Sequence, residues 1–463
     1  MGTSELINSE DNGLNNSPKS NINRVIVRNI VRVGLPVALQ SMLVALLSLT
    51  DVVMVSSYGT ESAAAVGLAS KWHFLIIMIM SGISQAAGIL IAQFAGKSDF
   101  KSAKSIFNKS LFLGLAIFTL PVILMTFMPS YFILCQTDDE NVIAQGSTYL
   151  VWSSLVQLLT FFVILCESSM RSTGDGFTPL VIGTITILLN IFFNYCFIGG
   201  HFGFSPMEVK GAAVATSLSR VIQFVILIGF FVVKGHWIYK SVSKALPETV
   251  TSRLKKLSVS CTASSVVFAV GAMISQILVG KIGTIELATY CILVPFFNLM
   301  YALYYGLSVA SSVTIGGLLG KKDFTGAKAT AKSFLKWIGV LGLITGVLLY
   351  LLKPVIILCL NFNDNQLDLA SYALNVASIY CVLCMLNMML VNGILRAGGQ
   401  NSYTLYCNII TTWCCDLPFT AIAVFLGCSF YTAYPFLYSG EILGFILLYI
   451  GYKKGRWLAD LTV

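Results

Sequence analysis

The stretch GKSDFKSAK at residues 96–104 recurs as GKKDFTGAK at residues 320–328, with six of nine residues identical at an offset of 224. Further matches at this offset are Gly59-Thr60 with Gly283-Thr284, Ala64 with Ala288, Gly82 with Gly306 and Ser84 with Ser308, and an offset of 225 pairs Arg171 with Arg396. Chance is a poor explanation for several matches at one spacing. The chain therefore contains two copies of one structural unit.

Each copy is built from apolar runs of about 20 residues, the length that crosses a bilayer core of about 30 Å. Hydrophobic residues make up 56% of the chain and charged residues 11%, so lipid is the expected solvent. Twelve spans are predicted, at residues 30–56, 63–94, 106–128, 143–169, 178–199, 210–233, 257–281, 287–318, 334–360, 369–395, 402–426 and 433–452. The short loops between them leave no room for a soluble catalytic domain, and we do not expect an enzyme.

Six helices separate the two copies, so each helix crosses the membrane in the same direction as its counterpart. We predict an all-α integral membrane protein with two parallel six-helix repeats that form two lobes, with the substrate between them. The expected parts are a polar cytoplasmic tail at 1–29, an amino lobe at 30–233, a cytoplasmic linker at 234–256, a carboxyl lobe at 257–455 and a second cytoplasmic tail at 456–463. We expect a monomer.

The loop charges set the orientation. Basic residues gather on one side, at Arg24, Arg28, Arg32, Lys97, Lys101, Lys104, Arg171, Lys234 to Lys256, Lys321, Lys322, Lys328, Arg396, Lys453, Lys454 and Arg456. Acidic residues gather on the other side, at Glu61, Asp138, Asp139, Glu140, Glu208, Glu286, Asp364 and Asp368. The positive-inside rule then places both termini in the cytoplasm. Because the net charge of +9 is spread over many loops, it does not indicate a nucleic-acid partner.

Motifs for other energy sources and chemistries are missing from the sequence. Gly96-Lys97-Ser98 lacks the earlier glycine of a phosphate-binding loop, since Ile91 stands at that position, so ATP is not the expected energy source. The 12 cysteines lie mostly inside apolar runs, and the Cys381 and Cys384 pair is typical of packing. No cofactor is expected.

Asp51 is the strongest candidate for a functional residue. An ionised carboxylate within the bilayer is energetically costly unless it is paired, hydrated or protonated. Asn190 and Asn194 lie one helical turn apart, and Thr216 adds a hydroxyl, so these residues offer oxygen ligands for a hard cation. Each of these residues also has a simpler explanation. Asp51 could be solvated at the end of its helix, Asn190 and Asn194 could form hydrogen bonds between helices, and Thr216 could donate to the backbone of its own helix.

Several motifs resemble the multidrug and toxic compound extrusion (MATE) family, and they follow one another in consistent order between residues 30 and 455. They are Gly34-Leu35-Pro36, Asp51, Met170-Arg171-Ser172-Thr173-Gly174-Asp175, Asn190 through Asn194, Gly211 to Thr216 and Leu395-Arg396-Ala397-Gly398-Gly399. The resemblance implies a V-shaped exporter of twelve helices in a bacterial inner membrane, driven by sodium or proton entry. It also implies an amino-lobe cation site at Asp51, Asn190, Asn194 and Thr216.

The carboxyl lobe departs from some members of that family, which carry acidic residues in the seventh and tenth helices. Residues 257–281 and 369–395 contain no Asp or Glu, and Ser275 occupies the repeat position of Asp51. The remaining acids are Asp416 and Glu441, which either line the cavity or pair with a nearby Arg or Lys. In the amino lobe, Glu167 and Arg171 are spaced for a local ion pair.

The function predicted from the sequence is an antiporter that exports amphipathic, often cationic small molecules in exchange for H+ or Na+. The alternative is a flippase for a lipid-linked precursor. The expected partners are the small-molecule substrate and membrane lipid.

Overall fold

The computed structural model describes residues 25–56, 60–360 and 362–463, and every regular element in these ranges is a helix. The first half contains η2 (Ile30–Gly34), α2 (Leu35–Ser56), α3 (Thr60–Gly96), α4 (Phe100–Phe127), α5 (Pro129–Leu134), α6 (Glu140–Ser154), α7 (Val156–Ser172), α8 (Phe177–Ile198), α9 (Glu208–Lys234) and α10 (Trp237–Lys240). The second half contains α11 (Glu248–Ile282), α12 (Thr284–Gly320), α13 (Phe324–Leu351), α14 (Lys353–Leu360), α15 (Asp364–Met388), η3 (Met389–Leu395), α16 (Asn401–Asn408), η4 (Ile409–Asp416), α17 (Leu417–Phe425), α18 (Phe430–Ala433), η5 (Tyr434–Tyr438) and α19 (Gly440–Lys453).

The predicted all-α fold with twelve spans is confirmed. Eleven helical stretches among the described residues are long and apolar enough to cross a membrane, and α6 and α7 form a twelfth that bends by 51°. Some helices extend beyond their predicted spans. Helix α11 begins at Glu248 rather than near residue 257, because its first turns are polar and a hydropathy pattern detects only the apolar part of a helix.

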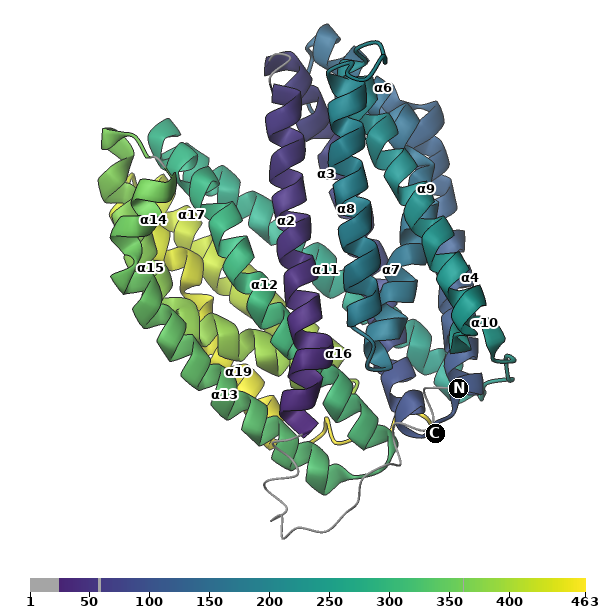
Figure 1. Cartoon of the computed structure of the whole chain (residues 1–463). Helices are drawn as coiled ribbons and strands as arrows, with labels where there is room; N and C mark the ends of the chain where they lie inside the picture. The colour runs from purple at the N-terminus through teal and green to yellow at the C-terminus, as the bar shows by residue number, and fades with distance from the viewer. Residues whose placement is uncertain (1–24, 57–59, 361) are drawn as a thin grey trace.

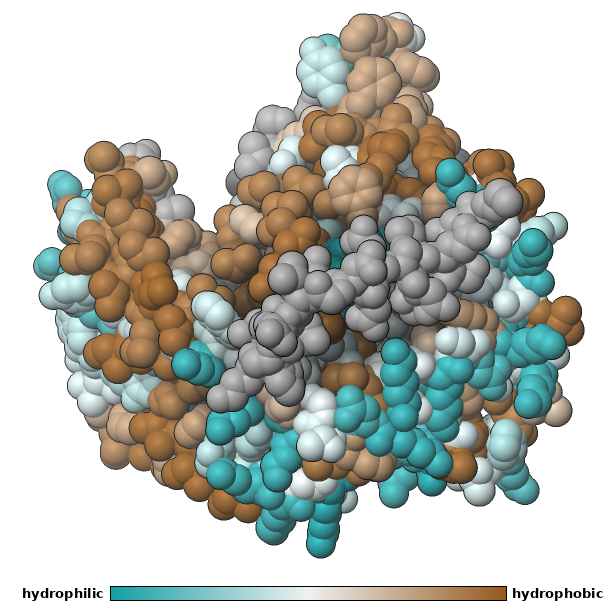
Figure 2. All heavy atoms as spheres, turned by 60° about the horizontal axis from the view of Figure 1, so that its bottom comes forward, coloured by the Kyte–Doolittle hydropathy of each residue, from teal (hydrophilic) through white to brown (hydrophobic). Residues whose placement is uncertain are grey.

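The helices form two lobes that meet at one end and diverge toward the other (Figure 1). One lobe contains α2 to α9 and the other contains α12 to α19. We call the meeting end, which carries loops 97–99 and 321–323, the closed end, and the opposite end the open end. Figure 2 brings the closed end forward, and hydrophilic residues gather there while a notch separates the lobes behind it.

The repeated stretch forms the same turn in both lobes at the closed end. Asp99 caps α4 by accepting a hydrogen bond from the backbone N–H of Ser102 (3.1 Å), and Asp323 caps α13 by accepting one from Gly326 (2.8 Å). The residue before each cap lies in the left-handed region, with φ of 60° at Ser98 and 63° at Lys322. The sequence repeat is thus a repeat of backbone conformation.

Glycines at repeat-related positions allow the lobes to approach closely. A Cβ on Gly320 would lie 2.0 Å from the backbone oxygen of Gln93, and one on Gly96 would lie 2.2 Å from that of Gly317. Nearer the membrane centre, Gly306 faces Gly34 and Ala38 in the same manner. Side chains at Gly96 and Gly320 would hold α3 and α12 apart, and one at Gly306 would hold α12 away from η2 and α2, so glycine sets the distance between the lobes.

The carboxyl-terminal residues cross the closed end. The side-chain oxygen Oε1 of Gln93 accepts a hydrogen bond from the backbone N–H of Leu461 (2.7 Å), and its amide donates to the carbonyl of Ala397 in the carboxyl lobe (3.0 Å). Lys97 forms an ion pair with Asp460 at 2.9 Å. Gln93 therefore bonds both to this terminal segment and to the opposite lobe.

This packing predicts opposite effects for two glycines one turn apart on α12. Gly320→Ala should lower the stability of the purified protein by about 1–3 kcal/mol, because the new methyl overpacks against Gln93. Gly317→Ala should leave stability unchanged or raise it by up to about 1 kcal/mol, since a Cβ there meets nothing within 4 Å and alanine favours a helix. Thermal unfolding in detergent measures both, and equal effects would contradict the proposed close contact.

Candidate functional site

The predicted amino-lobe cation site is distributed over helices α2, α8 and α9, which pack against one another. Asn190 and Asn194 on α8 are buried, with exposed fractions of 4% and 1%, and the amide of Asn194 donates to the Oδ1 of Asn190 at 3.3 Å. The Thr216 hydroxyl on α9 donates to the carbonyl of Ala212 in its own helix (2.9 Å). Asp51 belongs to α2, but its side chain lies outside the described part of the structure.

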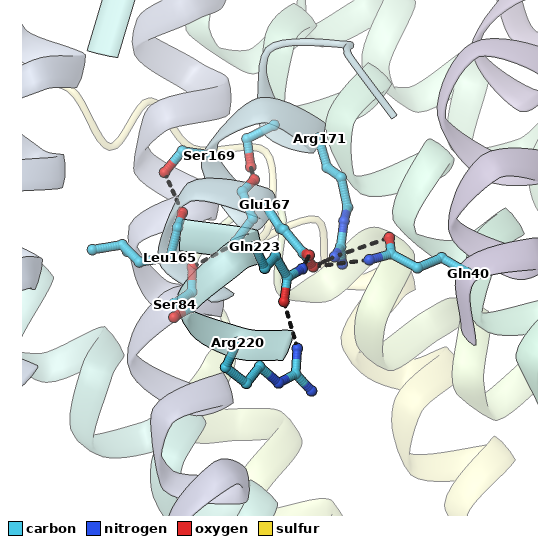
Figure 3. A network of polar contacts seen from close by, with 10 residues as sticks. Gln40, Ser84, Leu165, Glu167, Ser169, Arg171, Arg220 and Gln223 are labelled. Carbon is cyan, nitrogen blue, oxygen red and sulfur yellow. Dashed lines mark hydrogen bonds and ion pairs between the residues drawn. The ribbon is translucent and has the colours of Figure 1, made fainter. Parts of the chain in front are cut away.

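A second polar cluster surrounds Glu167 on α7 (Figure 3). Its carboxylate accepts hydrogen bonds from Gln40 on α2 (3.0 Å) and from Gln223 on α9 (3.2 Å). Arg171, one turn along α7, completes the cluster with an ion pair at 2.5 Å, which confirms the predicted pair. Arg220 donates in turn to Gln223 (2.7 Å). This carboxylate therefore joins three helices of the amino lobe.

The carboxyl lobe borders a cavity of about 550 Å³. The cavity is lined by residues from α3, α11, α12, α15, η3, α16, η4 and α19, so both lobes contribute to it. Met78, Phe268, Tyr301, Tyr305 and Met388 supply apolar and aromatic surface. Aromatic faces attract organic cations, and methionine adapts to ligands of different shape.

Asp416 and Glu441 both line this cavity. Glu441 accepts a hydrogen bond from the amide of Asn387 (2.6 Å), and Asp416 accepts one from the backbone N–H of Gly440 (2.6 Å). Neither forms an ion pair with an Arg or Lys among the described residues. Of the two predicted alternatives for these acids, the structure therefore favours the cavity.

Two π-helical turns shape the wall of the cavity. η3 carries Asn392 and follows directly on α15, while η4 ends at Asp416. A π-helical turn displaces the backbone from regular α-helical register and is frequent at functional sites. Sequence periodicity gave no indication of these turns, because they keep the apolar composition of the surrounding span.

Twelve membrane-crossing helices in two parallel repeats, with a largely apolar cavity between the lobes that also holds two carboxylates, define a polytopic transporter fold. The MatE family model matches residues 36–196 and 261–422, so its two copies begin 225 residues apart, in agreement with the internal repeat. The chain belongs to the MatE family. Members of this family are transporters of small molecules rather than enzymes.

Curated relatives and solved structures agree with this assignment. The chain is 24% identical to a probable multidrug resistance protein NorM of Thermotoga maritima over 86% of each chain. It is 25% identical to the multidrug resistance protein NorM of Photobacterium profundum, over 90% of this chain and 92% of the relative. The crystal structure of MATE in complex with MaL6 matches with a TM-score of 0.83 at 19% identity, over 94% of this chain and 96% of that chain. The structural match shows the fold.

The Glu167 cluster predicts a strong dependence of stability on one carboxylate. Glu167→Gln should destabilise the protein by about 3–5 kcal/mol, because it leaves the largely buried Arg171 without its counterion. The matched control is Asp460→Asn, which removes an ion pair whose lysine side chain is 29% exposed and should cost about 0–1 kcal/mol. Chemical unfolding of the two purified variants compares them, and a larger loss in Asp460→Asn would contradict this account of Glu167.

Proposed function

We propose that the protein is a secondary active antiporter that exports amphipathic, often cationic small molecules in exchange for an inward-moving cation. The observation that carries the proposal is the cavity of about 550 Å³ between the lobes, which combines aromatic surface with Asp416 and Glu441, two carboxylates without an ion-pair partner among the described residues. Arg396 lines the same cavity, but the two carboxylates and the aromatic rings form a part of its wall that attracts a positively charged amphipathic molecule. The relatives are named multidrug resistance proteins, which supports the export of small molecules.

The transport cycle follows from the arrangement of the two lobes. Their contact at the closed end rests on glycines and short polar contacts, and a contact of this kind can separate as two rigid bodies rock. We propose that closure of the open end accompanies separation of the closed end, so the cavity faces each side in turn. The loop charges favour the cytoplasm for the closed end and for both termini of a multi-pass protein of the bacterial cell membrane.

We assign the coupling cation to Asp51 on α2, with Asn190 and Asn194 on α8, a helix that packs against α2. Asp51 supplies the charge and the amides supply neutral oxygens, while Thr216 contributes least because its hydroxyl already bonds within α9. The ion is H+ or Na+, and the absence of a second matched carboxylate favours one ion in each cycle. One elementary charge gains about 2.3 kcal/mol per 100 mV of membrane potential, so the chemical gradient of the ion must add to it.

Efflux of ethidium from proteoliposomes tests the proposal when sodium and proton gradients are imposed separately. We expect an inward gradient of at least one of the two ions to accelerate efflux. Transport at the same rate with neither gradient present would overturn the coupled antiporter.

Asp51→Asn should abolish gradient-driven efflux while the protein still folds, because the amide keeps the shape of the carboxylate and loses its charge. Ser275→Ala at the repeat-related position is the matched control and should have a mild effect, since no charge is lost there. The ethidium assay measures both variants. Near-normal transport by Asp51→Asn would remove this residue from the coupling mechanism, and equal losses in both variants would indicate packing.

A further inference from the structure

Arg396, which follows η3 in the carboxyl lobe, is a buried cation without an acidic partner among the described residues. Its exposed fraction is 8%. The Nη1 atom donates to the side-chain oxygens of Asn392 (2.7 Å) and Gln85 (3.0 Å), both of which are neutral. The buried Nε has no hydrogen-bond partner. A guanidinium that is withdrawn from water and bonded only to amides is electrostatically uncompensated.

The internal repeat shows how the two lobes differ beside this arginine. The offset of 225 that pairs Arg171 with Arg396 also pairs Glu167 with Asn392, and both pairs are spaced i and i+4. The first pair lies within α7, and the second lies at the end of η3. In the amino lobe the chain itself supplies the counterion, through the ion pair between Glu167 and Arg171. In the carboxyl lobe the equivalent position is an amide, so the same arginine stands beside a neutral group.

Arg396 borders two neighbouring cavities. A small cavity of about 80 Å³ between the lobes is lined by Arg396 and Arg171, together with hydroxyls that include Ser312 and Tyr305. Arg396, Gln85, Tyr305 and Asn392 also line the larger cavity. A group in either cavity therefore lies beside Arg396.

We propose that this small cavity is a binding site for a monovalent anion, with Arg396 as its principal ligand. A guanidinium binds the oxygens of a carboxylate through charge-assisted hydrogen bonds, and it also attracts a halide. The volume suits an ion or group of a few heavy atoms. A bound anion restores in the carboxyl lobe the charge balance that Glu167 gives to the amino lobe. The site does not depend on the proposed antiport.

Equilibrium dialysis of the purified full chain against labelled chloride and labelled acetate tests this site, with sodium HEPES holding the ionic strength constant. We expect one saturable site per chain. Asn392→Glu should weaken binding about tenfold or more, because the introduced carboxylate would form an ion pair with Arg396, as Glu167 does with Arg171. Arg396→Gln should weaken binding at least as much. Arg456→Gln, which changes an exposed arginine, is the control and should bind like the unmodified protein.

The two probes separate the sources of the anion. Saturable binding of chloride alone indicates a halide site, while binding of acetate as well indicates a site that accepts a carboxylate group, such as one carried by a substrate. Both results support the proposal. Lack of saturable binding by either probe, or unchanged affinity in a folded Asn392→Glu protein, overturns it. Asn392→Glu keeps the test decisive if Arg396→Gln fails to fold, because it adds an ion pair and should preserve or raise the melting temperature.

Discussion

The contact between the lobes at the closed end is the constraint on which the rest of the structure depends. Glycines at positions 96, 306 and 320 let helix backbones approach until a single added Cβ would collide with an opposing atom. Small residues promote such close packing between helices in lipid, where no hydrophobic driving force brings helices together. With the closed end fixed in this way, the divergence of the helices leaves the cavity between the lobes.

Duplication gave the two lobes the same turns and the same contact glycines, but their buried charges have diverged. The amino lobe neutralises Arg171 with Glu167 and ties that pair to α2 and α9 through Gln40 and Gln223. The carboxyl lobe holds its acids at Asp416 and Glu441 on different helices and leaves Arg396 beside Asn392. One lobe is therefore internally compensated, while the other presents charges of both signs to a shared cavity.

The sequence predicted the twelve spans and the parallel repeats because each depends on patterns that extend over many residues. It also predicted the pair of Glu167 and Arg171, since i and i+4 neighbours on a helix meet in any packing. It missed Gln40 and Gln223, which reach Glu167 only through tertiary contacts between helices far apart in sequence. Glu167 and Asn392 align at the offset of 225, so the repeat does indicate that Arg396 has an amide where Arg171 has its carboxylate partner.

Spin-label distances at both ends of the molecule test the central claim, that the glycine-lined contact at the closed end separates as the open end closes. One pair of labels, at Asp138 and Asp364, spans the open end, and a second pair, at Lys101 and Lys321, spans the closed end; all four side chains are exposed. The labels are placed in a background with the 12 cysteines replaced. When the coupling cation is varied, we predict that the distance across the open end shortens as the distance across the closed end lengthens. Distances that change in the same direction at both ends, or that do not change, would contradict the account.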